Sequence, residues 1–223
     1  MADFRLVRAV SSVTRGTDDD QWMALRGTRD GSAFTADWID ALAMEGRCFA
    51  ANAGSGATAV TFAGAYDADG PDLVIQIPDG TVGIPLRVEV VLHTTGASAF
   101  QVIGLVSSTL AGTCTVTGGG TITPVNLRVD SPVASVATVN YGVDAAGCTD
   151  PNSGTYYEFF RAGHPSDPDA ATGHSPVYVW SAKNGGPLPM VVDGGSIVVY
   201  VGGTTGTGYI TAIWAELPEN SIT

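Results

Sequence analysis

Spaced aspartates are the first residues in this sequence that could do chemistry, because carboxylate oxygens are the usual ligands of Ca²⁺. They occur at Asp67, Asp69 and Asp72, and again at Asp167 and Asp169. Neither stretch supplies the later oxygen ligands or the bidentate Glu of an EF-hand loop. Aspartates beside Gly or Pro are typical of turns, in which their side chains bind nearby backbone groups. We therefore expect two turns, with a metal at one of these loops as the alternative.

The three histidines could contribute to a zinc site. His164 and His174 lie in one polar stretch, His93 lies elsewhere, and Cys148 is the nearest sulfur ligand in the sequence. Zinc needs four such ligands in tetrahedral geometry, and no spacing here provides them. Exposed histidines are the simpler interpretation, so no cofactor is expected.

The cysteines Cys48, Cys114 and Cys148 are odd in number and show no CxxC spacing. At most one intramolecular disulfide can form, and buried or unreactive thiols are the expected state. Residues 1–16 lack the continuous apolar core of a signal peptide, and no stretch reaches the length of a membrane span. The sequence therefore predicts a protein made in a cytoplasm, without a membrane partner.

Three glutamates on predicted strands, Glu89, Glu158 and Glu216, could line a hydrolytic cleft, because glycosidases use paired carboxylates. No GxSxG motif marks a nucleophilic serine. The glycine runs 117–120 and 202–208 are not followed by the GK[ST] of a phosphate-binding loop, and we expect hairpin turns there. Solvent-facing glutamates are the more ordinary interpretation, so the sequence predicts a protein that is not an enzyme.

Eight aromatic residues could build a sugar-stacking platform of the lectin type. Aromatic side chains also dominate protein cores and subunit contacts, and this second interpretation is the more common one. The residues concerned are Trp22, Trp38, Tyr156, Tyr157, Phe159, Phe160, Trp180 and Trp214.

The charge balance is acidic, with a net charge of −12 and only 10 basic residues. A body of this charge repels phosphate backbones, so direct nucleic-acid binding is not expected. Arginines gather near the N-terminus, where they can pair with neighbouring carboxylates or bridge to another subunit through planar guanidinium groups. These arginines are Arg5, Arg8, Arg15, Arg26, Arg29 and Arg47.

Runs of β-branched residues, separated by Gly, Pro, Asn and Asp, predict an all-β antiparallel sandwich of about ten strands. One helix is expected at 35–44, with Thr35 as its cap, and an opening strand at 3–9. The polar stretches 140–154 and 163–175 are expected to be surface loops. The predicted strands of the sandwich are 57–64, 72–78, 84–95, 99–108, 113–118, 125–130, 155–163, 176–182, 196–203 and 208–217.

Two predicted strands differ in their expected burial. Val88, Val90 and Leu92 alternate with mostly polar neighbours, which indicates a strand with one buried face. The stretch 196–203 has no such alternation, which indicates burial on both faces. This difference predicts two packed sheets, or one sheet that faces a neighbouring subunit.

The C-terminal region carries a family resemblance. Residues 196–217 read SIVVYVGGTTGTGYITAIWAEL, which is a strand, a Thr/Gly hairpin and a closing strand containing Trp214. Together with an N-terminal segment containing Arg and Trp, one short helix and glycine-punctuated strands, this arrangement resembles single jelly-roll virion proteins of bacteriophages. The resemblance implies an N-terminal arm with a short helix over 1–53 and a jelly-roll sandwich over 54–223, and it assigns no functional residue.

The low charge, the single lysine and the missing export signal fit the same resemblance. They predict a structural protein of the virion, in the capsid or as a capsid decoration protein, made in the host cytoplasm. Its expected partners are copies of itself, as a trimer or a larger lattice, and other virion proteins. The alternatives left open are a glycan-binding module, such as a receptor-binding tip or a lectin, and a β-sandwich hydrolase.

Overall fold

The structure is a computed structural model that describes residues 37–62, 66–94, 100–144, 146–164, 177–184, 187–202 and 206–221. Contacts divide the chain into two units, 1–41 and 42–223, and every strand of the described residues belongs to the second. Several residues discussed above lie outside the described ranges. They are the predicted strand 3–9, Trp22, Thr35, Asp167, Asp169, His174 and the arginines Arg5, Arg8, Arg15, Arg26 and Arg29.

The described residues form one α-helix, two sheets and three short 3-10 helices. The α-helix is α1 (Trp38–Met44). Sheet 1 contains β1 (Cys48–Ala53), β2 (Val60–Thr61), β4 (Thr81–Thr94), β7 (Val125–Asn126), β10 (Val177–Ser181) and β12 (Thr207–Pro218). Sheet 2 contains β3 (Leu73–Ile77), β5 (Phe100–Ser107), β6 (Val116–Ile122), β8 (Thr138–Val143), β9 (Tyr156–His164) and β11 (Gly195–Gly202). The 3-10 helices are η1 (Pro151–Ser153), η2 (Ala182–Asn184) and η3 (Glu219–Ser221).

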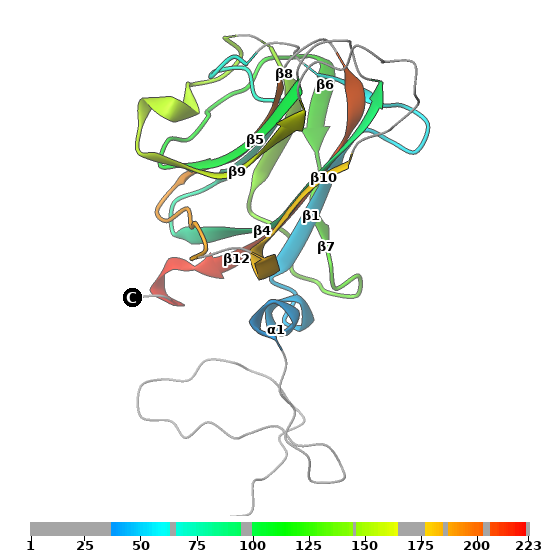
Figure 1. Ribbon diagram of the computed structural model, residues 1–223. Coiled ribbons are helices and arrows are strands. Elements are labelled where there is room, and N and C mark those ends of the chain that lie inside the picture. Colours follow the sequence, from blue (N-terminus) through cyan, green and yellow to red (C-terminus); the bar gives the residue numbers. More distant parts are fainter. Residues whose placement is uncertain are drawn as a thin grey trace, which may run out of the picture. The chain divides into compact units, whose positions relative to one another are not determined.

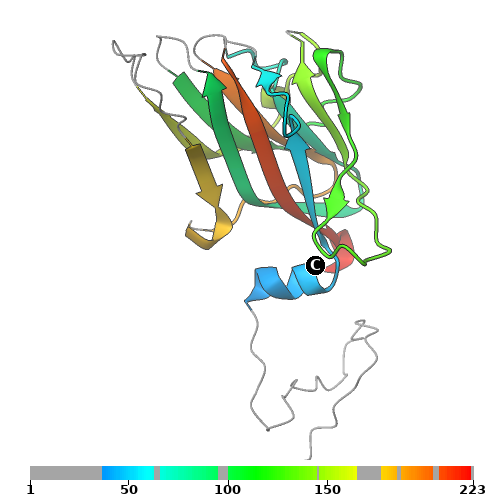
Figure 2. The same ribbon diagram turned by 90° about the vertical axis from the view of Figure 1, so that its right-hand side faces the viewer.

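The two sheets pack face to face as a sandwich (Figure 1). Sheet 1 runs in the order β10-β4-β12-β1-β7, with β2 beside β12, and sheet 2 runs β6-β8-β3-β11-β5-β9. Figure 2 shows β12, in red, beside β1, in blue. Every named strand pair is antiparallel, so the predicted all-β antiparallel sandwich is confirmed.

Eight of the strands pair in a nested order. In this set β1 pairs with β12, β3 with β11, β4 with β10 and β5 with β9. The first strand therefore pairs with the last, the second with the second-last, and so on to the middle of the chain. The pairs β12·β4 and β11·β5 then join these ladders into two sheets. Of the other four strands, β2 pairs with β12. Strands β6, β7 and β8 come between β5 and β9 in the chain and extend the sheets beyond β3 and β1.

The main core lies between the sheets. Val88, Val90 and Leu92 are buried there, which confirms the inward face predicted for this strand. Trp214 of β12 is also fully buried and packs on Phe49 of β1 with ring centroids 6.3 Å apart. Burial of such large aromatic side chains supplies much of the stability of a sandwich core.

Strand β11 is buried on both faces, as its lack of alternation predicted. Ile197 and Val199 belong to the main core, whereas Val198 and Tyr200 belong to a second apolar cluster on the other side of sheet 2. The second cluster also contains buried residues from outside β11, among them Ala111 and Val143. The chain's own segments therefore cover this face, and no neighbouring subunit is needed for it.

Several elements differ from the sequence-based expectation. Strand β1 lies within the range 1–53 assigned to the arm, yet it pairs with both β12 and β7. Strand β8 occupies part of the stretch 140–154 that was expected to be a loop. The glycine run 117–120 forms an irregular part of β6 with a register shift, where a hairpin turn was expected. Alanines and glycines give these segments weak strand signals, and their neighbours in the sheets supply the pairing.

Candidate interaction surface

The aspartates Asp67, Asp69 and Asp72 do not converge on one position. Asp67 and Asp69 lie in a turn closed by the Gly70 N–H, which donates to the Asp67 carbonyl at 3.1 Å. Their carboxyl groups hydrogen-bond each other, which raises the pKa of Asp67 and lowers that of Asp69. Asp72 is buried and accepts a hydrogen bond from the Val201 N–H at 2.7 Å. These aspartates shape the backbone, as expected of turn residues.

The histidines and Cys148, the other candidate metal ligands, also lie on different elements. His93 is exposed on β4 of sheet 1, and His164 is the last residue of β9 in sheet 2. Cys148 neighbours Cys114, with which it shares a hydrogen bond. Within the described part of the chain, no group of three or more His, Cys, Asp or Glu residues could hold a metal ion.

Glu158 lies on β9 of sheet 2, whereas Glu89 and Glu216 lie on β4 and β12 of sheet 1. Glu158 accepts two hydrogen bonds from Arg161, at 2.6 and 2.7 Å, and this hydrogen bonding lowers the pKa of Glu158. Glu89 lies opposite Thr211, five residues from Glu216 along β12, so Glu89 and Glu216 are about 17 Å apart at about 3.4 Å per residue. Catalytic carboxylate pairs lie about 5 to 9.5 Å apart. Glu216 instead has the structural contacts described below.

Seven of the eight aromatic residues lie within the described ranges, and these seven do not assemble into one platform. They are buried (Phe160 and Trp214), packed as a pair with ring centroids 4.5 Å apart (Phe159 and Trp180), or exposed (Trp38, Tyr156 and Tyr157). Tyr156 and Tyr157 are consecutive on β9 and so point to opposite faces of the sheet. A sugar ring therefore meets no shared stacking surface among these residues.

A different feature stands out on the surface, the segment 125–136, which we call the valine loop. It begins with the two residues of β7 and carries five exposed apolar side chains. These are Val125 (61% exposed), Leu127 (42%), Val129 (91%), Val133 (48%) and Val136 (56%). Several exposed apolar side chains on one short segment are typical of an interaction site, because isolated proteins keep apolar patches small.

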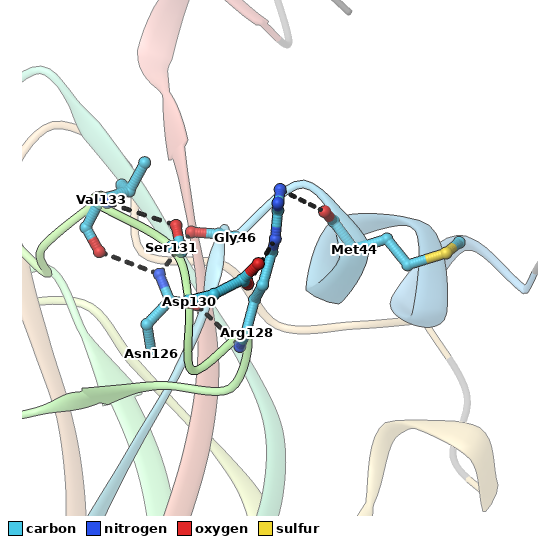
Figure 3. A network of polar contacts seen from close by, with 7 residues as sticks. All are labelled: Met44, Gly46, Asn126, Arg128, Asp130, Ser131 and Val133. Atoms are coloured by element: carbon cyan, nitrogen blue, oxygen red, sulfur yellow. Dashed lines mark hydrogen bonds and ion pairs between the residues drawn. The ribbon is translucent and has the colours of Figure 1, made fainter. Parts of the chain in front are cut away.

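Polar side chains hold the valine loop in one shape (Figure 3). The Asn126 side-chain amide donates to the Gly46 carbonyl at 2.8 Å and to the Val133 carbonyl at 2.9 Å. Its oxygen accepts the Arg128 N–H at 2.9 Å, and the Arg128 guanidinium donates to the Met44 carbonyl at 3.3 Å. One asparagine thus ties both ends of the loop to the segment that ends α1.

The backbone conformation at the C-terminal end of α1 allows the valine loop to pack closely against it. The Arg47 N–H donates to the Leu42 carbonyl and the Gly46 N–H to the Ala43 carbonyl, both at 3.0 Å, which is a Schellman cap. Gly46 has φ +73°, a conformation that favours glycine. A Cβ at this position would also lie 2.4 Å from Ser131 Oγ, so glycine allows the loop to approach.

The far end of the loop is anchored by Glu216, which is 7% exposed. Its carboxylate accepts hydrogen bonds from the Ser135 hydroxyl, from the Val136 N–H at 2.9 Å and from Trp214 Nε1 at 2.8 Å. Its backbone N–H donates to the Arg47 carbonyl at 2.9 Å. The carboxylate therefore joins the main core to the valine loop.

The braced valine loop presents a pre-shaped apolar surface. A rigid surface loses little conformational entropy on binding, so more of the contact energy remains for affinity. Sequence reasoning missed the loop because VNLRVD at 125–130 alternates as a strand does. The signal that could have revealed it is Asn126, a residue that favours turns over strands.

Comparisons with known proteins add no relative. The chain matches no protein-family model, no curated protein and no solved structure at a significant level. In the part of the chain that the structure describes, no helix has the length and apolar character needed to span a bilayer.

Proposed function

We propose that this protein is a self-assembling structural subunit of a bacteriophage virion, in the capsid or as a capsid decoration protein. Copies of the chain meet through the valine loop, and other virion proteins are further partners. The observation that carries the proposal is the coincidence, on one loop, of five exposed apolar side chains and a polar brace. Exposing these apolar side chains to water is unfavourable, and a protein partner that covers the loop best explains why they are exposed.

The strand order supports the same proposal. We interpret the nested pairing of eight strands as that of a jelly roll, in which two Greek keys form a double sheet. Viral capsid proteins and lectins both use this architecture. The architecture alone therefore leaves two classes of function, structural and glycan-binding.

The chemistry of the valine loop favours the structural class. All five exposed apolar residues are aliphatic, whereas sugar rings are bound by aromatic faces and polar groups. Aliphatic side chains gain free energy mainly by leaving water, which suits a contact between protein surfaces. Because each copy has a net charge of −12, we expect assembly to strengthen with added salt, which screens the repulsion.

The test is sedimentation velocity of the full chain at micromolar concentration, together with the variants Val129→Asp and Val133→Asp. We expect the wild type to form oligomers and each variant to associate at least about tenfold more weakly, because a carboxylate would be buried in the contact. Val192→Asp is the matched control, since Val192 is 42% exposed outside the loop. It is expected to assemble as the wild type does.

The proposal fails if the wild type stays monomeric, both alone and with the other shell components. It also fails if Val129→Asp assembles like the wild type while its melting temperature is unchanged. The virion role has a separate check, because genes for a terminase or a portal protein should flank the gene of this protein.

A further inference from the structure

Two of the three cysteines, distant in sequence, are neighbours in the fold. The side chains of Cys114 and Cys148 hydrogen-bond each other. The Thr115 N–H, next to Cys114, donates to the Gly147 carbonyl, next to Cys148, at 2.7 Å. The Thr149 N–H donates to the Ala111 carbonyl at 2.9 Å, so a second backbone bond joins the same two segments.

These segments, 109–116 and 146–153, form the cover of sheet 2. They lie over the second apolar cluster, against which Cys114 and Cys148 both pack. Buried Ser196 of β11 fastens the first segment, because its hydroxyl donates to the Thr109 carbonyl at 2.8 Å and accepts the Ala111 N–H at 3.1 Å. The two cysteines therefore sit where the two halves of the cover meet.

The two thiols differ in their readiness to react. The hydrogen bond from Cys148 lowers the pKa of Cys114, whereas the same contact and burial raise the pKa of Cys148. The Asp69 carbonyl oxygen lies 3.0 Å from Cys148 Sγ and is a second acceptor for the single proton of this thiol. Both thiols are partly accessible and free, while Cys48 is fully buried on β1 of the other sheet. Cys114 is the sulfur that attacks an oxidant first, because the thiolate is the nucleophile.

We propose that Cys114 and Cys148 are an oxidation site, at which a peroxide forms a disulfide that locks the cover of sheet 2. The Cys114 thiolate attacks one peroxide oxygen, the O–O bond breaks, and the departing hydroxide takes up a proton to become water. The sulfur of Cys148 then attacks the resulting sulfenic acid and displaces a second water as the S–S bond forms. Two thiols lose two electrons and two protons, and one hydrogen peroxide becomes two waters.

The experiment treats the full chain with a small excess of hydrogen peroxide and then alkylates the remaining thiols in denaturant. Mass spectrometry is expected to find one alkylated cysteine, Cys48, and a cross-linked peptide containing Cys114 and Cys148. The disulfide closes a loop of about 35 residues, so the melting temperature should rise by about 5–10 °C and return on reduction.

Cys114→Ser and Cys148→Ser are the matched variants, and each should lose both the cross-link and the rise in melting temperature. The proposal is overturned if three thiols remain after treatment, if the bridge joins two chains on a non-reducing gel, or if the single variants show the same rise. The mass readout uses wild-type protein, so it stands even where a variant does not fold. The result is independent of the proposed assembly through the valine loop.

Discussion

The cover of sheet 2 and the valine loop both involve apolar residues outside the main core, but these residues are buried in the first region and exposed in the second. Under the cover, Val198 and Tyr200 are sealed from water by segments of the same chain. On the valine loop, Val129 is 91% exposed although the backbone around it is tied by side-chain hydrogen bonds. Both regions are held by buried polar groups: Ser196 of β11 fastens the cover, and Glu216 anchors the valine loop.

The difference teaches that polar bracing serves two purposes in this fold. At the cover, the polar contacts hold segments over an apolar surface, so losing these contacts should lower the free energy of unfolding directly. At the valine loop polar bracing keeps an open surface in shape, so its loss should loosen the loop before it unfolds the domain. Substitutions in the two regions can therefore separate a stability role from a binding role.

The largest effect is expected for Tyr200→Ala in the sealed region. Tyr200 is 2% exposed, lies 4.8 Å from the Tyr66 ring and donates its hydroxyl to the Ala68 carbonyl at 2.6 Å. Its truncation leaves a cavity and an unsatisfied carbonyl, so the free energy of unfolding should fall by about 3–5 kcal/mol. Urea denaturation measures it. Tyr157→Ala, at a 60% exposed tyrosine, should change stability by less than about 0.5 kcal/mol, and equal losses would contradict the comparison.

A smaller effect is expected for Glu216→Gln, which alters the anchor of the valine loop. The amide nitrogen would face one of the donors that the carboxylate accepts, such as the Val136 N–H, and leave it unpaired. We expect a loss of about 1–3 kcal/mol and faster hydrogen exchange at Val136 than at Val90 in the core. Glu158→Gln, at a solvent-accessible ion pair, is the control and should cost at most about 1 kcal/mol. Unchanged exchange at Val136 would show that Glu216 does not hold the loop.

The smallest expected effect is a loss of stability at alkaline pH, and it concerns Tyr200 in the region buried under the cover. Burial, with a contribution from Tyr66, raises the pKa of Tyr200 above its ordinary value. The unfolded chain releases this proton near pH 10 while the folded chain keeps it, so stability present below that pH is lost as the pH rises. The loss is at most about 1.4 kcal/mol per pH unit.

Tyr200→Phe removes this titration but keeps the ring. At neutral pH it should cost about 1 kcal/mol, because the Ala68 carbonyl loses its donor. Urea denaturation at several pH values should show that this difference from the wild type narrows above pH 10. A constant difference at all pH values would mean that the Tyr200 hydroxyl is not held neutral by the fold.

Much of the sandwich could be predicted from local pattern. The alternation of Val88, Val90 and Leu92 indicated one inward face, and the unbroken apolar stretch of β11 indicated two. Such patterns are reliable because side chains alternate between faces along any strand, whatever its partners. Composition likewise set the acidic charge, which no folding step changes.

Only the tertiary structure decided the features that depend on distant partners. Strand β1 has an alanine-rich sequence and exists because β12 and β7 supply its hydrogen bonds. Strand β7 ends at Asn126, whose side-chain amide donates to the carbonyls of Gly46 and Val133. Glu216 anchors the valine loop because Ser135 and Val136 donate to its carboxylate. The neighbours of each of these residues come from remote parts of the chain, and long-range packing, which local sequence does not encode, selects them.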